Sequence, residues 1–308
     1  MQSQSYNIET HGVDAQVVTS SWLNQVERGQ VKEAADTGTR LTRGLLREFS
    51  QARKIWNPEV IGPERLTPSL TTDQPMVVCR KEPDSVAVTL PLYGTGTSEI
   101  FRDAAYPVYF GKIEGKRFQK NIVELMVQGY DIRKVLADNA IKDMGAQELK
   151  HLRDAAEVCI AQTGNITPAA AWNSAAFVSL FQAQIDGRKG RGAMLMPESC
   201  YYEAINLPAT QIGDQPAAEH YANGTKVEAS LWGTPVVTTI HKDIVAPQNG
   251  ASWSVYLFAP QDALGNAFML RDATLFIEQK ETEIFFHTYE IYGGTIGDAR
   301  GVRRLDIA

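Results

Sequence analysis

Residues 131–162, DIRKVLADNAIKDMGAQELKHLRDAAEVCIAQ, decide the fold. Apolar side chains recur there every three to five positions, which is the spacing of one face of an α-helix. The apolar set comprises Ile132, Leu136, Ile141, Met144, Leu149, Leu152, Ala156 and Cys159. Charged residues occupy much of the opposite side. Asp131 can cap the helix and Thr163-Gly164 can end it. We therefore predict one amphipathic helix of about 45 Å, with a kink near Gly145 where the spacing slips.

Before this helix, residues 76–110 have the pattern of a β-hairpin with a long, irregular tip. Side chains alternate with period two in Val86, Val88 and Leu90, and again in Tyr106, Val108 and Phe110. The centre, YGTGTSEIFRD (93–103), contains two glycines. A further strand is expected at Asn121–Val127. Strands this long without nearby partners indicate a hairpin that extends away from the main body.

The N-terminal region divides into an arm and a helix. The first 30 residues are polar and predict an arm that docks on another surface, whereas Val31 to about Trp56 shows helical spacing. Arg40, Arg43 and Arg47 form one stripe of that helix. The stripe is either a solvated or ion-paired face, or a face that meets phosphate or an acidic protein segment. Three prolines between residues 58 and 68 then predict an extended connector.

The rest of the chain mixes helices and strands. We predict a helix over Pro168–Ile185, a buried strand at AMLMP (193–197) and a short helix at ESCYYEAI (198–205). Strands follow at SLWGTPVVTTI (230–240), WSVYLFAP (253–260), ATLFIEQK (273–280) and EIFFHTYEIYGG (283–294), with a last one in the tail. This order predicts an α+β fold rather than repeated βαβ units.

Composition excludes several classes of protein. The 308 residues carry a formal charge of -6 and are 44% hydrophobic, which excludes disordered and coiled-coil chains. The acidic balance argues against a dedicated nucleic-acid binder, and no apolar run reaches the length of a membrane helix. The first residues, MQSQSYNIETHG, lack the basic and apolar regions of a secretory signal. Three widely spaced cysteines, Cys79, Cys159 and Cys200, predict free thiols in a reducing compartment.

No catalytic or cofactor-binding constellation is evident. None of the five histidines has metal-ligand spacing with another His or a Cys. Gly94 and Gly96 lack the third glycine of a dinucleotide fingerprint. The basic run GRKGRG (187–192) is expected to be a solvated turn, with phosphate binding as the alternative. We therefore predict no enzyme activity, no cofactor and no metal.

The order of segments nevertheless resembles a known family. AMLMPESCYYEAI (193–205), VEASLWGTPVVTTIHKDIV (227–245) and YLFAPQDALGNAFMLRDATLFIEQ (256–279) are similar to successive segments of tailed-bacteriophage major capsid proteins with the Hong Kong 97-like fold. The resemblance covers about residues 70–308. It implies an N-terminal arm and helix (1–70), an E-loop (71–112), a peripheral domain with the spine helix (113–166), an axial domain (167–270) and strands returning to the peripheral domain (271–308).

The resemblance also implies a function. Such a chain would assemble as pentamers and hexamers into the icosahedral head around the double-stranded DNA of a tailed phage. It would be made in the bacterial host cytoplasm and located in the virion, with no membrane partner. The expected partners are further copies of itself, a separate scaffolding protein, a portal, a possible decoration protein and packaged DNA. No covalent cross-linking pair is identifiable.

Particular residues are assigned roles on this basis. Val86, Val88, Leu90 and Phe101 are expected to make apolar contacts with an adjacent subunit. Arg40, Arg43 and Arg47 are expected to line the inner wall and meet DNA or an acidic scaffold segment. Two other classes stay open: an encapsulin-like cellular compartment that packages enzymes, and an enzyme with an unrecognised site around Cys200 and His241.

Overall fold

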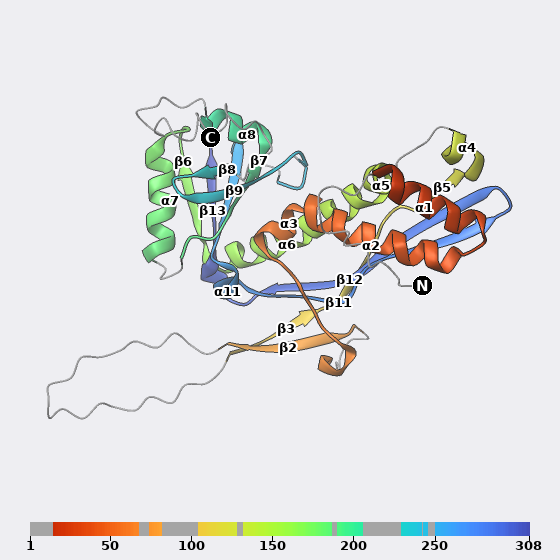
Figure 1. The fold of residues 1–308 in the computed structure, drawn as a ribbon. Helices are drawn as coiled ribbons and strands as arrows, with labels where there is room; N and C mark the ends of the chain where they lie inside the picture. Colours follow the sequence, from red (N-terminus) through yellow and green to blue (C-terminus); the bar gives the residue numbers. More distant parts are fainter. Residues whose placement is uncertain are drawn as a thin grey trace, which may run out of the picture.

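The computed structural model of the chain describes residues 15–67, 74–81, 104–127, 132–186, 190–205, 229–241, 243–245 and 250–308. Strands within these ranges form sheets of five, six and two strands. The six-stranded sheet lies at one end of an elongated molecule, and the five-stranded sheet extends along the rest of it (Figure 1). The two-stranded sheet stands off to one side of this body.

The long helix forms as predicted, in three continuous pieces. α5 (Ile132–Leu136) passes through a π-helical turn (Ala137–Ile141) into α6 (Lys142–Thr163). Gly164 ends the helix in the left-handed conformation, at φ 67°, which glycine adopts without steric cost. The apolar spacing has a five-residue step from Leu136 to Ile141, and this step falls in the π turn. A π turn holds one more residue than an α-helical turn, so both side chains stay on the buried face. The predicted kink near Gly145 stays a prediction.

The five-stranded sheet is dominated by a long hairpin of β11 (Gly265–Lys280) and β12 (Glu283–Ile296). β4 (Gly111–Glu114) and β5 (Phe118–Asn121) pair with β12 on one side, and β1 (Glu59–Val60) runs parallel to β11 at the other edge. Alternate β12 residues, from Ile284 to Tyr292, are buried. Period-two alternation thus directs one face of the hairpin towards the helices.

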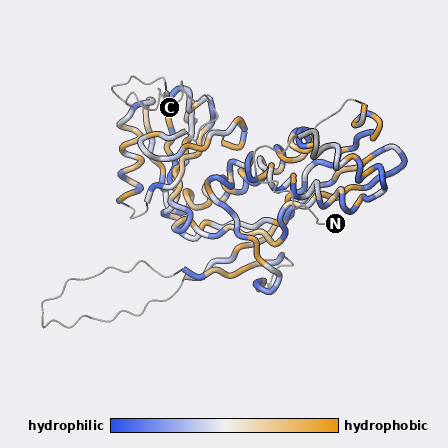
Figure 2. Tube along the Cα trace, in the orientation of Figure 1, coloured by the Kyte–Doolittle hydropathy of each residue, from blue (hydrophilic) through white to orange (hydrophobic). Residues whose placement is uncertain are grey.

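Helices cover the buried face of this sheet. α2 (Val31–Phe49) packs on β11, and α3 (Gln51–Ile55) packs on α6. The helix predicted for Val31–Trp56 is therefore broken at Ser50, whose extended backbone lets its side chain cap α3. Figure 2 shows hydrophilic and hydrophobic residues alternating along these elements, as expected for elements with one buried face.

The polar N-terminal arm is a prediction that the structure corrects in part. Ala15–Glu27 forms helix α1, which packs on α2. Trp22 is fully buried there, donates a hydrogen bond to the Ala34 carbonyl (3.1 Å) and stacks 5.9 Å from Phe286. A largely polar sequence becomes a helix because one large aromatic anchor is buried against another helix and a strand.

The second correction concerns Asn121–Val127, which was expected to be a strand. Strand β5 ends at Asn121, and Ile122–Val127 form helix α4. The Asn121 side-chain oxygen accepts a hydrogen bond from the backbone N–H of Val123 (2.9 Å). This is the helix-capping role that asparagine favours, and it overrides the β-propensity of the following Ile and Val.

The six-stranded sheet has the order β6 (Ile166–Ala169), β13 (Val302–Ile307), β10 (Trp253–Phe258), β7 (Met194–Pro197), β9 (Thr234–Thr239) and β8 (Ala229–Leu231). Helices α7 (Ser174–Asp186) and α8 (Glu198–Ile205) accompany it, and α11 (Gln261–Leu264) leads into β11. Apart from β6, its strands lie where the sequence predicted them, and so does α8. β13 joins this sheet, so residues 271–308 are divided between the two large sheets; the domain boundaries themselves remain a prediction.

A third correction applies to the helix predicted over Pro168–Ile185. Pro168 lies in β6, an edge strand that runs parallel to β13, and α7 begins only at Ser174. An edge strand tolerates proline because one side of it needs no N–H donors. The Asn173 side chain accepts a hydrogen bond from the N–H of Ala176 (2.8 Å), which sets the true start of the helix.

The predicted hairpin begins and ends as expected. β2 (Met76–Lys81) pairs with β3 (Ala104–Tyr109), with Val77 opposite Val108 and both buried. The tip and its predicted contact residues Val86, Val88, Leu90 and Phe101 lie outside the described residues. No helix in the described part of the chain is both long and apolar enough to cross a membrane.

Candidate functional site

The predicted arginine stripe lies on α2, but its three members are not equivalent. Arg40 and Arg47 are exposed. Arg43 Nε donates to the Ala273 carbonyl (2.9 Å) and lies 3.4 Å from the Asp272 carboxylate on β11. Arg43 therefore fixes α2 to the sheet, whereas Arg40 and Arg47 remain exposed to solvent.

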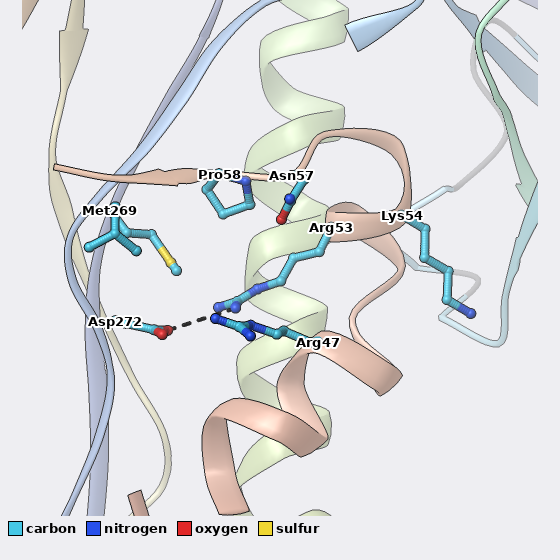
Figure 3. Close-up of a pocket in the computed structure, with 8 residues that line it drawn as sticks. Arg47, Arg53, Lys54, Asn57, Pro58, Met269 and Asp272 are labelled. Carbon is cyan, nitrogen blue, oxygen red and sulfur yellow. Dashed lines mark ion pairs between the residues drawn. The ribbon is translucent and has the colours of Figure 1, made fainter. Parts of the chain in front are cut away.

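An open groove of about 480 Å³ lies beside the end of this stripe. Its lining comes from the end of α2, from α3 and the segment after it, and from β1 and β11 (Figure 3). The lining residues are Arg47, Arg53, Lys54, Asn57, Pro58, Val60, Met269 and Asp272. Arg47 and Arg53 point towards Asp272, whereas Lys54 points away from it at the rim.

A buried ionic network lies behind the groove. Arg53, only 8% exposed, donates to both oxygens of Glu148 on α6 and, through Nη2, to Glu290 on β12 (2.8 Å). Its Nη1 lies 3.8 Å from Asp272, and Ser50 Oγ donates to Glu148. The network ties α3, α6, β11 and β12 together. A buried cation of this kind persists only when several carboxylates surround it.

One carboxyl group in this network, that of Glu290, keeps its proton at neutral pH. Burial, followed by the negative charge of Glu148, raises the pKa of Glu290 to about 9 although Arg53 opposes the shift. Burial alone would lower the pKa of Arg53, but Glu148, Glu290 and Asp272 outweigh it and raise that pKa. At neutral pH the Glu290 carboxyl group is therefore protonated, and it still accepts a hydrogen bond from Arg53 Nη2.

A second buried network ties the same helix to the other large sheet. Glu157 of α6 accepts hydrogen bonds from Arg304 on β13 (2.6 Å) and from the Tyr256 hydroxyl on β10 (2.5 Å). Arg304 also bridges to Asp306 (2.9 Å). Because Glu148 and Glu157 lie on one continuous helix, α6 links the five-stranded and six-stranded sheets rigidly.

The base of the hairpin is fixed to the body by specific contacts. Lys81, the last residue of β2, forms an ion pair with the buried Asp298 (2.7 Å). The Tyr106 hydroxyl of β3 accepts from Asn266 (2.7 Å), and a Cβ on Gly297 would lie 2.6 Å from the Tyr106 ring. These contacts set the direction in which the chain leaves the body at Lys81 and returns at Ala104.

The cysteine-based enzyme site is disfavoured by its surroundings. Cys200 is fully buried, and burial raises its pKa far above neutrality, so that the nucleophilic thiolate does not form. Burial likewise raises the pKa of Cys159 to about 11. All three cysteines are buried and free, as the sequence predicted. Within the described ranges, no group of His, Cys, Asp and Glu side chains could hold a metal ion.

Sequence reasoning missed the buried network altogether. No sequence pattern marks Arg53 or Glu148 as buried. One signal was available, because Glu148 precedes the apolar Leu149 on the helix and so borders its apolar face. Its partners lie 95 and 142 positions away, at Arg53 and Glu290, and nothing in the sequence pairs them.

No protein-family profile matches the sequence, and no curated protein does. Solved structures do match. The structure of Mycobacterium phage Adephagia aligns with a TM-score of 0.54 and 8% identity over 84% of this chain and 90% of that one. Mycobacterium phage Cain gives a TM-score of 0.54 at 9% identity, with the same coverage. The chain has the fold of these phage structures.

A virus-like particle from Pyrococcus furiosus is similar too, with a TM-score of 0.51 and 15% identity over 89% of this chain and 100% of that one. The predicted α+β class and the predicted resemblance to a phage capsid fold are therefore confirmed. At these sequence identities, what this chain shares with the three matched structures is the fold alone.

Proposed function

We propose that the chain is the major capsid protein of a tailed phage, located in the virion. Copies assemble as pentamers and hexamers into an icosahedral shell that encloses double-stranded DNA. The observation that carries the proposal is the shared fold with phage structures over 84% of this chain and 90% of theirs. A match of this extent covers most of both chains, and so exceeds one common motif.

The two-stranded sheet supports assembly. Val78 and Tyr109, on its outward face, are 40% and 44% exposed. An isolated two-stranded ribbon is marginally stable in water. A neighbouring subunit would cover the exposed apolar side chains and stabilise the ribbon beyond its fixed base. The inter-subunit contacts of Val86, Val88, Leu90 and Phe101 belong to this part of the proposal.

The exposed arginines of α2 suit the inner wall. Arg40 and Arg47 would meet DNA phosphates or an acidic segment of a separate scaffolding protein, and Arg43 would hold their helix in place. Each phosphate contact adds about 0.9 to the salt slope of binding. Many weak copies could therefore order packaged DNA without sequence preference. A portal and a decoration protein complete the proposed set of partners.

A charge reversal tests the inner-wall assignment. Arg40→Glu should leave the subunit folded, since its side chain is exposed, and should shorten the packaged DNA or reduce scaffold content. Arg47 is kept in this test because it also lines the groove. Arg43→Glu should instead destabilise the subunit, because it leaves Asp272 facing a second carboxylate. Full-length DNA and normal scaffold content in Arg40→Glu would contradict the assignment.

The Pyrococcus furiosus particle keeps a cellular compartment as the second candidate, because its fold matches about as well. The contents of the particle distinguish a phage capsid from a cellular compartment. For a capsid, purified particles should sediment in the megadalton range and contain double-stranded DNA or an empty lumen. A consistent protein cargo would favour the compartment. A small oligomer without DNA or protein cargo would exclude both a capsid and a compartment.

A further inference from the structure

The groove beside α3 has a positive charge that the described residues of its own chain do not neutralise. Asp272 on its floor is already paired with Arg43 (3.4 Å) and Arg53 (3.8 Å). Arg47 and Lys54 line the groove and are exposed, and neither has an ion-pair partner among the residues that the structure describes. Two cations are thus available to a ligand from outside.

The remaining lining favours a peptide over a nucleic acid. Val60, 58% exposed, lies in the groove together with Pro58 and Met269. These apolar surfaces suit the aliphatic part of a side chain. A continuous phosphate backbone would meet Asp272 on the floor, and the buried Glu148 lies behind it. Separated carboxylates, one for each rim cation, fit this distribution of charge better.

The chain itself carries an acidic element of suitable shape. The β11–β12 hairpin turns over two residues, because Lys280 pairs with Glu283 across it. Glu281, at φ 52°, and Glu283 are exposed and have no ion-pair partner within the described ranges. Lys280 is occupied by Glu278 (3.2 Å) and lies over the Phe285 ring. The tip is short and presents two carboxylates, so little order is lost when it binds.

The tip cannot occupy the groove of its own chain. Asp272 on the groove floor and Lys280 at the tip belong to one strand, β11. The eight steps from Asp272 to Lys280 span about 26 Å at the rise of an extended strand. Because the paired β11 and β12 are rigid over this length, the two surfaces can meet only between different copies.

We propose that the groove binds the acidic β11–β12 tip, residues 278–283, of a neighbouring copy. Two different surfaces of one chain then join head to tail, which produces rings or closed shells according to the angle between copies. Carboxylates at Glu281 and Glu283 would approach Arg47 and Lys54. The inference rests on the proposed shell, because only an assembly brings copies into contact.

Cross-linking tests the contact directly. Chains with Lys54→Cys and chains with Glu281→Cys are mixed, assembled and treated with a short bis-maleimide. Dimers should form in the mixture and not in particles of either variant alone, because the native cysteines are buried. Wild-type particles that form normally while the mixture yields no dimer would overturn the inference and leave the proposed function intact.

A charge swap supplies the second test, and it leaves Arg47 unchanged because that residue also belongs to the proposed inner wall. Lys54→Glu and Glu281→Lys should each weaken association of subunits about twofold to fivefold, within the range for exposed ion pairs. The double variant should recover most of the loss. Lys32→Glu, an exposed reversal on α2, is the matched control and should change little.

A double variant that assembles no better than the worse single variant would overturn the contact. So would cross-links from Lys54→Cys to another segment or another protein. Failure of the wild-type chain to assemble at all would refute the proposed function instead, so the two failures are distinguishable.

Discussion

Replacement of Glu290 by Gln should remove a pH dependence of stability that is built into the core. In the folded chain, burial and the Glu148 charge raise the pKa of Glu290 to about 9, against an ordinary value of 4.5. Between these pH values the native state holds a proton that the unfolded chain has released. Stability therefore falls as pH rises through this window, by about 1.4 kcal/mol per pH unit from this group.

Between pH 6 and pH 8, that slope amounts to about 3 kcal/mol. Gln is the neutral isostere of the protonated carboxyl group, so the variant should lose this contribution and be the more stable chain at pH 8. Urea unfolding of unassembled subunits at pH 6, 7 and 8 measures the difference. Glu48→Gln, at an exposed site, is the control. Parallel pH dependences in wild type and Glu290→Gln would show that Glu290 is ionised in the folded chain.

Three further predictions address the core, the hairpin and the thiols. Arg53→Met leaves Glu148 buried without its cation and should cost about 3–5 kcal/mol in unfolding experiments; an unchanged unfolding midpoint would contradict the role of the network. Replacement of residues 93–102 by a short Gly-Ser link should preserve the circular dichroism spectrum of the subunit and prevent stable shells, unless the hairpin has no part in assembly. Native mass spectrometry after alkylation at neutral pH should find Cys79, Cys159 and Cys200 unmodified, and all three modified after denaturation; a disulfide without reductant would refute this.

Much of the fold could be predicted because local periodicity and burial agree. The apolar spacing of 131–162 gave the long helix, and alternation along 253–307 gave the main strands. The errors occurred where a single side-chain hydrogen bond decides where a helix begins. Asn121 caps a helix in a run of β-formers, and Asn173 delays the start of α7. In both cases the side-chain hydrogen bond outweighs the propensity of the neighbouring residues.

The candidate surfaces were less accessible to sequence reasoning. Spacing correctly placed Arg40 and Arg47 on an exposed side of α2, but it could not show that Arg43 is paired with Asp272, 229 positions later. The groove has lining residues from two distant parts of the chain, around Arg53 and Met269. Such sites exist only after the sheet and helices have packed, because no local pattern records which distant charges meet.

Electron microscopy of the purified, full-length chain after assembly tests the central claim most directly. The account predicts closed icosahedral shells in which each facet resolves into pentamers and hexamers of this fold, with the β2–β3 ribbon of one copy lying over the next. A monodisperse monomer at high concentration and physiological salt, with no shell in any preparation, would contradict it.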